Sequence, residues 1–134
     1  MTLISDSARA FLRGRRFAVV ATLNPDGTPQ QSVMWYDVRG DTLIMNTQAH
    51  AVKVKNLRRD PRIYVCVEDE YRYVNLAGRA EIDYDPARTQ ADIAALAERY
   101  EGPDGRERMV RNTFSKQQRV TIHVPIERVD PHGV

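Results

Sequence analysis

Cysteine is almost absent from this sequence, and its scarcity limits the chemistry that the chain can support. Cys66 is the single cysteine among 134 residues, so an internal disulfide cannot form. Because it lies in the apolar run 63–67, we expect it to pack in the core as a small hydrophobic residue. His50, His123 and His132 have no metal-ligand spacing with one another or with Cys66, so we predict no zinc or iron site.

Long hydrophobic runs and strong net charge are also missing. No apolar stretch approaches the roughly 18 residues that cross a bilayer, so we expect no transmembrane helix, no signal peptide and a cytoplasmic protein. A net charge of +2 does not by itself indicate nucleic acid as a partner. Arg58, Arg59 and Arg62 fit a solvated helix end better than a nucleic-acid site, because no aromatic stacking residues lie near them. The GxGxxG, P-loop and GxSxG motifs are absent.

What the sequence does contain is the pattern of a mainly β domain that covers residues 1–134. Apolar and alternating runs predict six strands, at residues 17–23, 29–38, 42–46, 63–67, 71–84 and 119–129. A serine or aspartate at 5–7 predicts the cap of a short helix that ends at Gly14, and Asp85 as cap with Pro86 at the first helical position predicts the start of a helix at 85–100. Further helices are predicted at 48–59 and 106–114, with a loop at 103–105. We expect the first three strands to form a meander and Gly78 to mark a bulge. Mostly hairpin connections favour an antiparallel barrel with peripheral helices.

One segment has the features of an anion site. If Thr47 caps the helix that follows it, the first amide groups of that helix point outward without partners. Lys53 and Lys55 add positive charge beside them, which suits a phosphate. The alternative interpretation is an ordinary capped surface helix that happens to carry two lysines.

Three blocks of the sequence resemble the pyridoxamine 5'-phosphate oxidase-like FMN-binding split-barrel family, and within it the branch that depends on the deazaflavin coenzyme F420. The blocks are residues 17–30, 53–62 and 119–126. They come in the order and spacing of that family, and the similarity extends from about Phe11 to Val129. The resemblance implies a six-stranded antiparallel split β-barrel that forms a homodimer and binds a flavin or deazaflavin in a groove between subunits.

The same resemblance implies which residues bind the cofactor. The strand 31–36 is expected to line the ring system, largely through backbone groups, and Thr47 with Lys53 to meet the phosphate. The full set of expected cofactor-binding residues is Ser32, Val33, Met34, Trp35, Asn46, Thr47, Lys53, Lys55 and Asn56. Asn56 has an alternative role as a brace for its helix. Tyr71, Tyr73 and Arg119 are expected either to reach the site from the other subunit or simply to pack.

The function that the resemblance implies is an F420-dependent oxidoreductase that transfers a hydride between the deazaflavin and a small unsaturated organic substrate. No catalytic residue is assigned; Tyr36, Tyr73, His50 or water could supply a proton. One alternative is an FMN-binding flavoprotein with pyridoxamine phosphate oxidase-like activity, and another is a carrier that binds flavin or deazaflavin without turnover. The expected partners are the small substrate and a second copy of the chain, with no nucleic acid and no membrane span.

Overall fold

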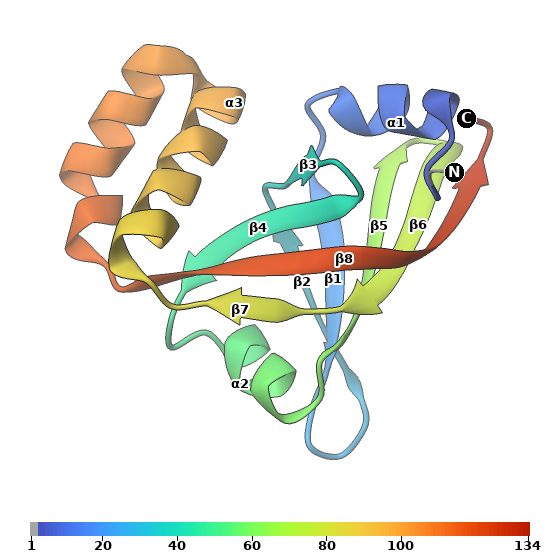
Figure 1. The fold of residues 1–134 in the computed structure, drawn as a ribbon, viewed down its shortest axis with the longest axis horizontal. Helices are drawn as coiled ribbons and strands as arrows, with labels where there is room; N and C mark the ends of the chain where they lie inside the picture. The colour runs from blue at the N-terminus through green and yellow to red at the C-terminus, as the bar shows by residue number, and fades with distance from the viewer. Residues whose placement is uncertain (1–2) are drawn as a thin grey trace.

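The computed structural model describes residues 3–134 as an antiparallel sheet that curls around one core, with helices at its rims (Figure 1). The strands in this range are β1 (Ala18–Leu23), β2 (Pro29–Met34), β3 (Asp37–Arg39), β4 (Thr42–Gln48), β5 (Arg62–Asp69), β6 (Arg72–Arg79), β7 (Glu81–Asp83) and β8 (Arg119–His132). The helices are α1 (Asp6–Arg13), α2 (Val52–Arg59), α3 (Pro86–Asn112) and the 3₁₀ turn η1 (Phe114–Lys116). The expected mainly β class with peripheral helices is confirmed.

The long strand β8 joins the two halves of the sheet. The strand order is β2-β1-β5-β6-β8-β4-β3, and β7 also pairs with β8. The first half of β8 pairs with β4 and β7, and its second half pairs with β6 (Figure 1). The register between β6 and β8 shifts between Ala77 and Gly78, so the predicted bulge is present. A Cβ at Gly78 would lie 2.6 Å from the Pro125 carbonyl oxygen, which explains the glycine.

The prediction of six strands is wrong, because two predicted strands are each divided in the structure. The segment 29–38 breaks at Trp35 and Tyr36, where the Tyr36 amide donates to the Tyr100 hydroxyl at 3.1 Å instead of to a neighbouring strand. The segment 71–84 breaks at Ala80 to give β6 and β7. Both pairings of the predicted meander are present, since β1 pairs with β2 and β3 pairs with β4, but β2 and β3 lie at opposite ends of the strand order, so the three segments do not form one continuous meander. The result is an eight-stranded sheet within the described residues.

Helices α1 and α2 lie at opposite ends of the barrel (Figure 1). The Ser5 side chain accepts from the Ala8 amide and caps α1, and α1 buries Ala8, Phe11 and Leu12 against the barrel core. Of α2, only Leu57 belongs to that core cluster. Cys66 does not belong to it, contrary to expectation. It alternates with the buried Val65 and Val67 on β5 and is half-buried on the outer side of the sheet, where burial raises the pKa of its thiol.

Helix α3 is a hairpin of two helical arms rather than one rod. Asp85 caps its start, with Pro86 in the first turn, as predicted. The backbone turns at Gly102, whose φ is 75°, and the helix continues through Pro103, so the loop predicted at 103–105 is wrong. Figure 1 shows the two arms side by side at the edge of the β4–β8 ribbon. No helix within residues 3–134 is long and apolar enough to span a membrane.

Candidate functional site

A hollow of about 350 Å³ opens where the ends of β2 and β4, the start of β8, the first turn of α2 and helix α3 meet. Six of the nine predicted cofactor residues line it, namely Val33, Met34, Trp35, Asn46, Thr47 and Lys53. Four residues that the sequence did not place at a site of this chain complete the wall, namely Ile93, Met109, Phe114 and Arg119. The structure therefore brings most of the predicted set together around one space.

Lys53 brings an uncompensated positive charge to the hollow. It is the second residue of α2 and is half-buried, and this burial lowers the pKa of its ammonium group. Among residues 3–134 no carboxylate lies within ion-pair distance of Lys53, and its ammonium group makes no hydrogen bond. A bound anion would supply the missing partner and would stabilise the charged form.

Thr47 lies at the hollow but does not cap α2. It is part of β4, paired with Val120 of β8, and the ladder continues through Gln48 and Arg119. Helix α2 starts later, at Val52, with Ala51 as a cap residue that provides no side-chain hydrogen bond. The prediction of a Thr47 cap is therefore wrong, because strand pairing holds this residue in extended backbone.

Arg119 is the second positive charge in the hollow, and it comes from the same chain as Lys53. Its Nε donates to Asn46 Oδ1 at 2.7 Å, its Nη1 donates to Gln117 Oε1, and its guanidinium lies 4.7 Å from the centre of the Phe114 ring. Burial lowers the pKa of Arg119 to about 10, a value at which the group is still charged at neutral pH. In the described part of the chain it has no acidic partner.

The side chain of Asn46 is already fully used within the protein. Its Nδ2 donates to the Thr89 carbonyl at 2.9 Å and to Thr121 Oγ1 at 3.1 Å, and its Oδ1 accepts from Arg119. Asn46 is only 7% exposed. Its contribution to the hollow is therefore to hold Arg119 in place.

Trp35 forms a fixed aromatic wall. Its ring stacks on Tyr100 with centroids 5.0 Å apart and an angle of 6° between the planes, and it meets Phe114 edge-on at 6.4 Å. The Tyr100 hydroxyl accepts from the Tyr36 amide and donates to the Arg16 carbonyl, which ties the stack to the barrel. Such a wall offers a flat apolar surface to a ring system.

The remaining three predicted cofactor residues lie outside the wall of the hollow. The Ser32 Oγ is buried and has no hydrogen-bond partner among residues 3–134. Lys55 is exposed on α2. Asn56 is buried and donates to Thr22 Oγ1 and to Asn24 Oδ1, each at 3.1 Å, which is the brace that the sequence left open as an alternative.

The candidate proton donors do not gather at the hollow. The Tyr36 hydroxyl donates to the Leu12 carbonyl at 2.8 Å, and burial raises its pKa to about 12, so it is not available as an acid. Tyr73 stacks on His132 at 4.3 Å, and His50 is exposed. Tyr71, which was expected to reach the site from the other subunit or to pack, is 91% exposed at a turn. Of the candidate donors Tyr36, Tyr73 and His50, none lines the hollow.

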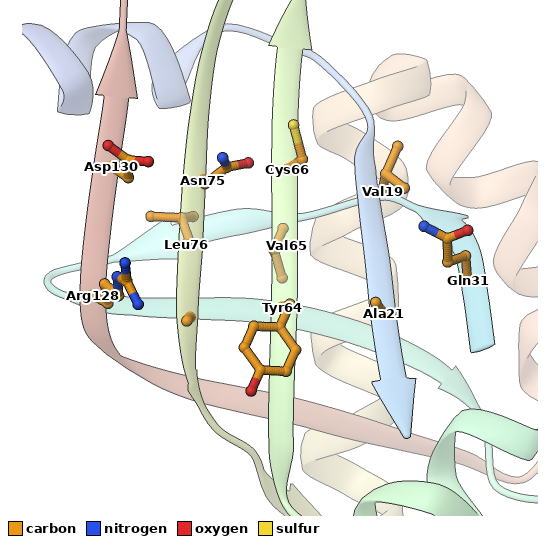
Figure 2. A pocket seen from close by; sticks show the side chains of 11 residues that line it. Val19, Ala21, Gln31, Tyr64, Val65, Cys66, Asn75, Leu76, Arg128 and Asp130 are labelled. Carbon is orange, nitrogen blue, oxygen red and sulfur yellow. The ribbon is translucent and has the colours of Figure 1, made fainter. Parts of the chain in front are cut away.

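A second hollow, also of about 350 Å³, lies on the outer side of the sheet. We call this side the outer face. Figure 2 shows its side chains in rows across β1, β2, β5, β6 and β8, with labels that include Val19, Ala21, Gln31, Tyr64, Cys66, Asn75, Arg128 and Asp130. Large apolar side chains stay accessible near it, since Phe17 is 57% exposed, Tyr64 45% and Val33 66%. Val33 lines the first hollow and pairs across the β1–β2 ladder with Val19, which lines the second, so the two hollows lie on either side of this pair.

Comparisons with known proteins agree with this geometry. The chain is 30% identical over 130 residues to a protein of Mycobacterium tuberculosis (strain CDC 1551 / Oshkosh) named F420H(2)-dependent biliverdin reductase, a match that covers 96% of this chain and 88% of that protein. A solved structure of a conserved hypothetical protein from Mycobacterium tuberculosis superposes with a TM-score of 0.82 at 31% identity, covering 98% of this chain and 86% of the other.

A solved structure named F420 reductase superposes with a TM-score of 0.77 at 27% identity, covering 95% of this chain and 98% of the other. The family model described as pyridoxamine 5'-phosphate oxidase matches residues 4–133, which is almost the whole sequence. The chain therefore belongs to the pyridoxamine 5'-phosphate oxidase-like family.

Proposed function

We propose that this protein is an oxidoreductase that uses coenzyme F420 to reduce a small unsaturated organic substrate. The observation that carries the proposal is the hollow in which two half-buried cations, Lys53 and Arg119, have no acidic partner among residues 3–134 and lie beside the aromatic wall of Trp35. Two relatives at 27% and 30% identity are named as F420-dependent or F420 reductases, and they support deazaflavin over other ligands.

The residues present fit such a cofactor. Lys53, with Thr47 beside it, would hold the phosphate, because a half-buried ammonium group without a partner favours an anion. The backbone of Val33, Met34 and Trp35 would lie along the ring system. When bound, F420 supplies the hydride; the chain's own residues bind and orient the reactants and exclude water.

The first arm of α3 and the turn η1 would exclude water from one side of the hollow. Ile93 and Phe114 belong to an apolar cluster that also packs against Trp35 and Met109. In a site with such a wall, charge interactions are stronger than in bulk water. We therefore assign α3 the role of cover over the reacting ring.

The outer face is proposed to bind a second copy of this chain. Its exposed apolar side chains would be covered in a dimer. Because the exposed Val33 lines the first hollow and pairs with Val19 of the second, a second copy on the outer face would also cover one side of the cofactor site. This arrangement would complete a groove that is open in one chain.

The alternative cofactor is FMN, which the match to the pyridoxamine 5'-phosphate oxidase model favours. Its phosphate would use the same Lys53, so the anion site alone does not distinguish the two. A carrier without turnover is the remaining alternative. Multiple turnover with any substrate would eliminate it.

The test is a parallel titration of the purified protein with F420 and with FMN, following cofactor fluorescence and the bound absorption spectrum. We expect micromolar or tighter binding of F420 and weak binding of FMN. The opposite preference would establish the flavoprotein alternative. Binding of neither would contradict the proposed function altogether.

A further inference from the structure

We infer that Arg119 forms a separate anion subsite, which binds a carboxylate of the substrate rather than the cofactor phosphate at Lys53. This inference rests on the proposed function and names the class of substrate, namely conjugated organic molecules that carry a carboxylate. Arg119 is held by hydrogen bonds to neutral groups, lies on the α3 side of β4, and has an apolar wall around its guanidinium group.

The protein positions the guanidinium of Arg119 with neutral groups only. Asn46 Oδ1 accepts from Nε at 2.7 Å and the Gln117 amide oxygen accepts from Nη1. Nη2 makes no hydrogen bond within residues 3–134. These two hydrogen bonds fix the orientation of the guanidinium, but they leave its positive charge unpaired and its Nη2 donors unused. A carboxylate can accept from such donors and pair with the charge.

A chain of hydrogen bonds determines which end of the Asn46 amide faces Arg119. The Thr89 carbonyl is only an acceptor, so the group 2.9 Å from it must be the Asn46 NH₂. Thr121 Oγ1 accepts from that NH₂ and donates to Asp92 Oδ2 at 2.8 Å. The carboxylate of Asp92 thus accepts from Thr121 and forms an ion pair with Arg39. Arg119 contacts the neutral amide of Asn46 and not this carboxylate.

The two cations reach the hollow from different elements, Arg119 from the β4–β8 ribbon and Lys53 from α2. Asn46 and Thr47 are consecutive in β4, so their side chains point to opposite faces. Asn46 faces α3, since it donates to Thr89 of that helix, and it holds Arg119 on the same side. Thr47 points to the opposite face, which carries the buried Met45, and Lys53 comes from the first turn of α2 rather than from the ribbon. The two cations therefore reach the hollow from different elements, and we assign one anion to each.

The surroundings of Arg119 suit an apolar body attached to the carboxylate. Phe114 lies under its guanidinium at 4.7 Å, and Ile93 and Met109 line the same hollow. Such a wall favours a ligand that combines a flat apolar part with one negative charge. A small inorganic anion would leave this wall uncovered.

The experiment compares wild type with Arg119→Gln on a panel of conjugated carboxylic acids, each paired with its methyl ester, with biliverdin and its dimethyl ester as one pair. Binding is followed through Trp35, the single tryptophan of the chain, which lies in the hollow. We expect wild type to prefer at least one acid over its ester by about tenfold to a hundredfold, and the variant to lose that preference. Arg119→Lys should retain part of it, and Arg108→Gln, which removes an exposed charge on α3, should retain it fully.

A carboxylate could also come from the glutamate tail of F420, and a second arm separates the two sources. F420 and the deazaflavin chromophore that lacks phosphate and tail are titrated into the same variants. We expect Arg119→Gln to bind F420 as tightly as wild type does. Loss of F420 binding in this variant, with unchanged binding of the chromophore, would assign Arg119 to the cofactor and overturn the inference.

Failure of the inference and failure of the proposed function give different results. If wild type binds F420 but shows no preference between any acid and its ester, the substrate subsite is refuted and the F420 function stands. If wild type does not bind F420, the proposed function fails, and the Trp35 titration still decides whether Arg119 binds a carboxylate. If Arg119→Gln does not fold, Gln117→Glu replaces it, because a carboxylate that accepts from Nη1 of Arg119 should abolish the acid preference while the guanidinium remains.

Discussion

Single residues at the hollow combine positive charge with partial burial. Lys53 is half-buried at the start of α2, without an acidic partner among residues 3–134. The neighbouring Lys55 is exposed and lies outside the hollow. A phosphate would therefore gain more from Lys53 than from Lys55, because partial burial reduces screening by solvent.

Replacing Lys53 with alanine should weaken F420 binding by about 1.5–3 kcal/mol, the usual contribution of a hydrogen bond to a charged group. The measurement is a fluorescence titration of F420 into wild type, Lys53→Ala and a control variant at one salt concentration, which compares their dissociation constants. The matched control is Lys55→Ala, which removes the same charge from the same helix and should change affinity little. Equal losses in the two variants would show that only the net charge of α2 matters.

Affinity for F420 should also fall as pH rises. Burial lowers the pKa of Lys53 from its ordinary value of 10.5, so in the free protein the ammonium group loses its proton earlier than an exposed lysine. The charged form binds the phosphate, which means that affinity is full at neutral pH and declines toward alkaline pH. Lys53→Arg should extend the plateau to higher pH. An identical pH profile for both proteins would argue against Lys53 as the phosphate ligand.

Asn56 gives a test of a structural role against a binding role. Its buried amide donates to Thr22 Oγ1 and to Asn24 Oδ1, each at 3.1 Å. Asn56→Ala should lower the free energy of unfolding by about 1–3 kcal/mol, since buried polar groups lose their partners, and the folded variant should bind F420 normally. Urea unfolding and titration measure the two effects. If Asn56→Ala is stable but binds the cofactor weakly, Asn56 has a direct role in cofactor binding.

At the scale of elements, local signals predicted α1 and the start of α3 well. Ser5 and Asp85 cap these helices as the sequence indicated, because a capping side chain needs only its own helix. The Thr47 cap failed because the ladder between β4 and β8 depends on residues more than seventy positions apart. The break at Trp35 likewise depends on Tyr100 of α3, a contact that no local pattern contains.

The wall of the hollow was the least predictable part of the site. Met109 and Phe114 reach it only because α3 folds back at Gly102, whereas the sequence indicated a loop and a separate helix there. The family resemblance pointed to Lys53 through one of its blocks and to the strand 31–36 as the lining of the ring, and Lys53 and residues 33–35 line one hollow in the structure. Arg119 was noted from its block, but its position beside Lys53 in the same chain required the fold.

The turn of α3 can be tested directly at Gly102. Its φ of 75° and ψ of 178° lie in a region that is essentially restricted to glycine. Gly102→Ala should therefore cost about 1–3 kcal/mol of unfolding free energy, and it should change the fluorescence of Trp35, because the second arm carries part of the hollow's wall. The control is Ala95→Gly, at an exposed position in the first arm. It tests whether a substitution elsewhere in the helix also changes the Trp35 signal, and we expect that signal to stay unchanged. An unaltered melting curve for Gly102→Ala would mean that the hairpin does not need this backbone conformation.

At the scale of the whole molecule, the site lies where the two halves of the curled sheet meet. The β4–β8 ribbon contributes Asn46, Thr47 and Arg119, while β2 at the other end of the strand order contributes Val33 and Met34, with Trp35 directly after that strand. Helix α3 holds the two together through Tyr100, whose hydroxyl bonds to the backbone of residues 16 and 36. Changes in the packing of α3 would therefore alter the distance between the cations and the aromatic wall.

The outer face leads to the last prediction, which concerns assembly. Tyr64 is 45% exposed in the middle of this face and lines its hollow, so a glutamate there would place a charge in the proposed contact between two copies. Light scattering at micromolar concentration should give a dimer for wild type and a monomer for Tyr64→Glu. Tyr71→Glu, at a turn residue that is 91% exposed and does not line the hollow of this face, should remain a dimer. The monomeric variant should also bind F420 more weakly, because Val33 connects the face to the cofactor hollow. A monomeric wild type, or full F420 affinity in a monomeric Tyr64→Glu, would show that one chain alone forms the complete site.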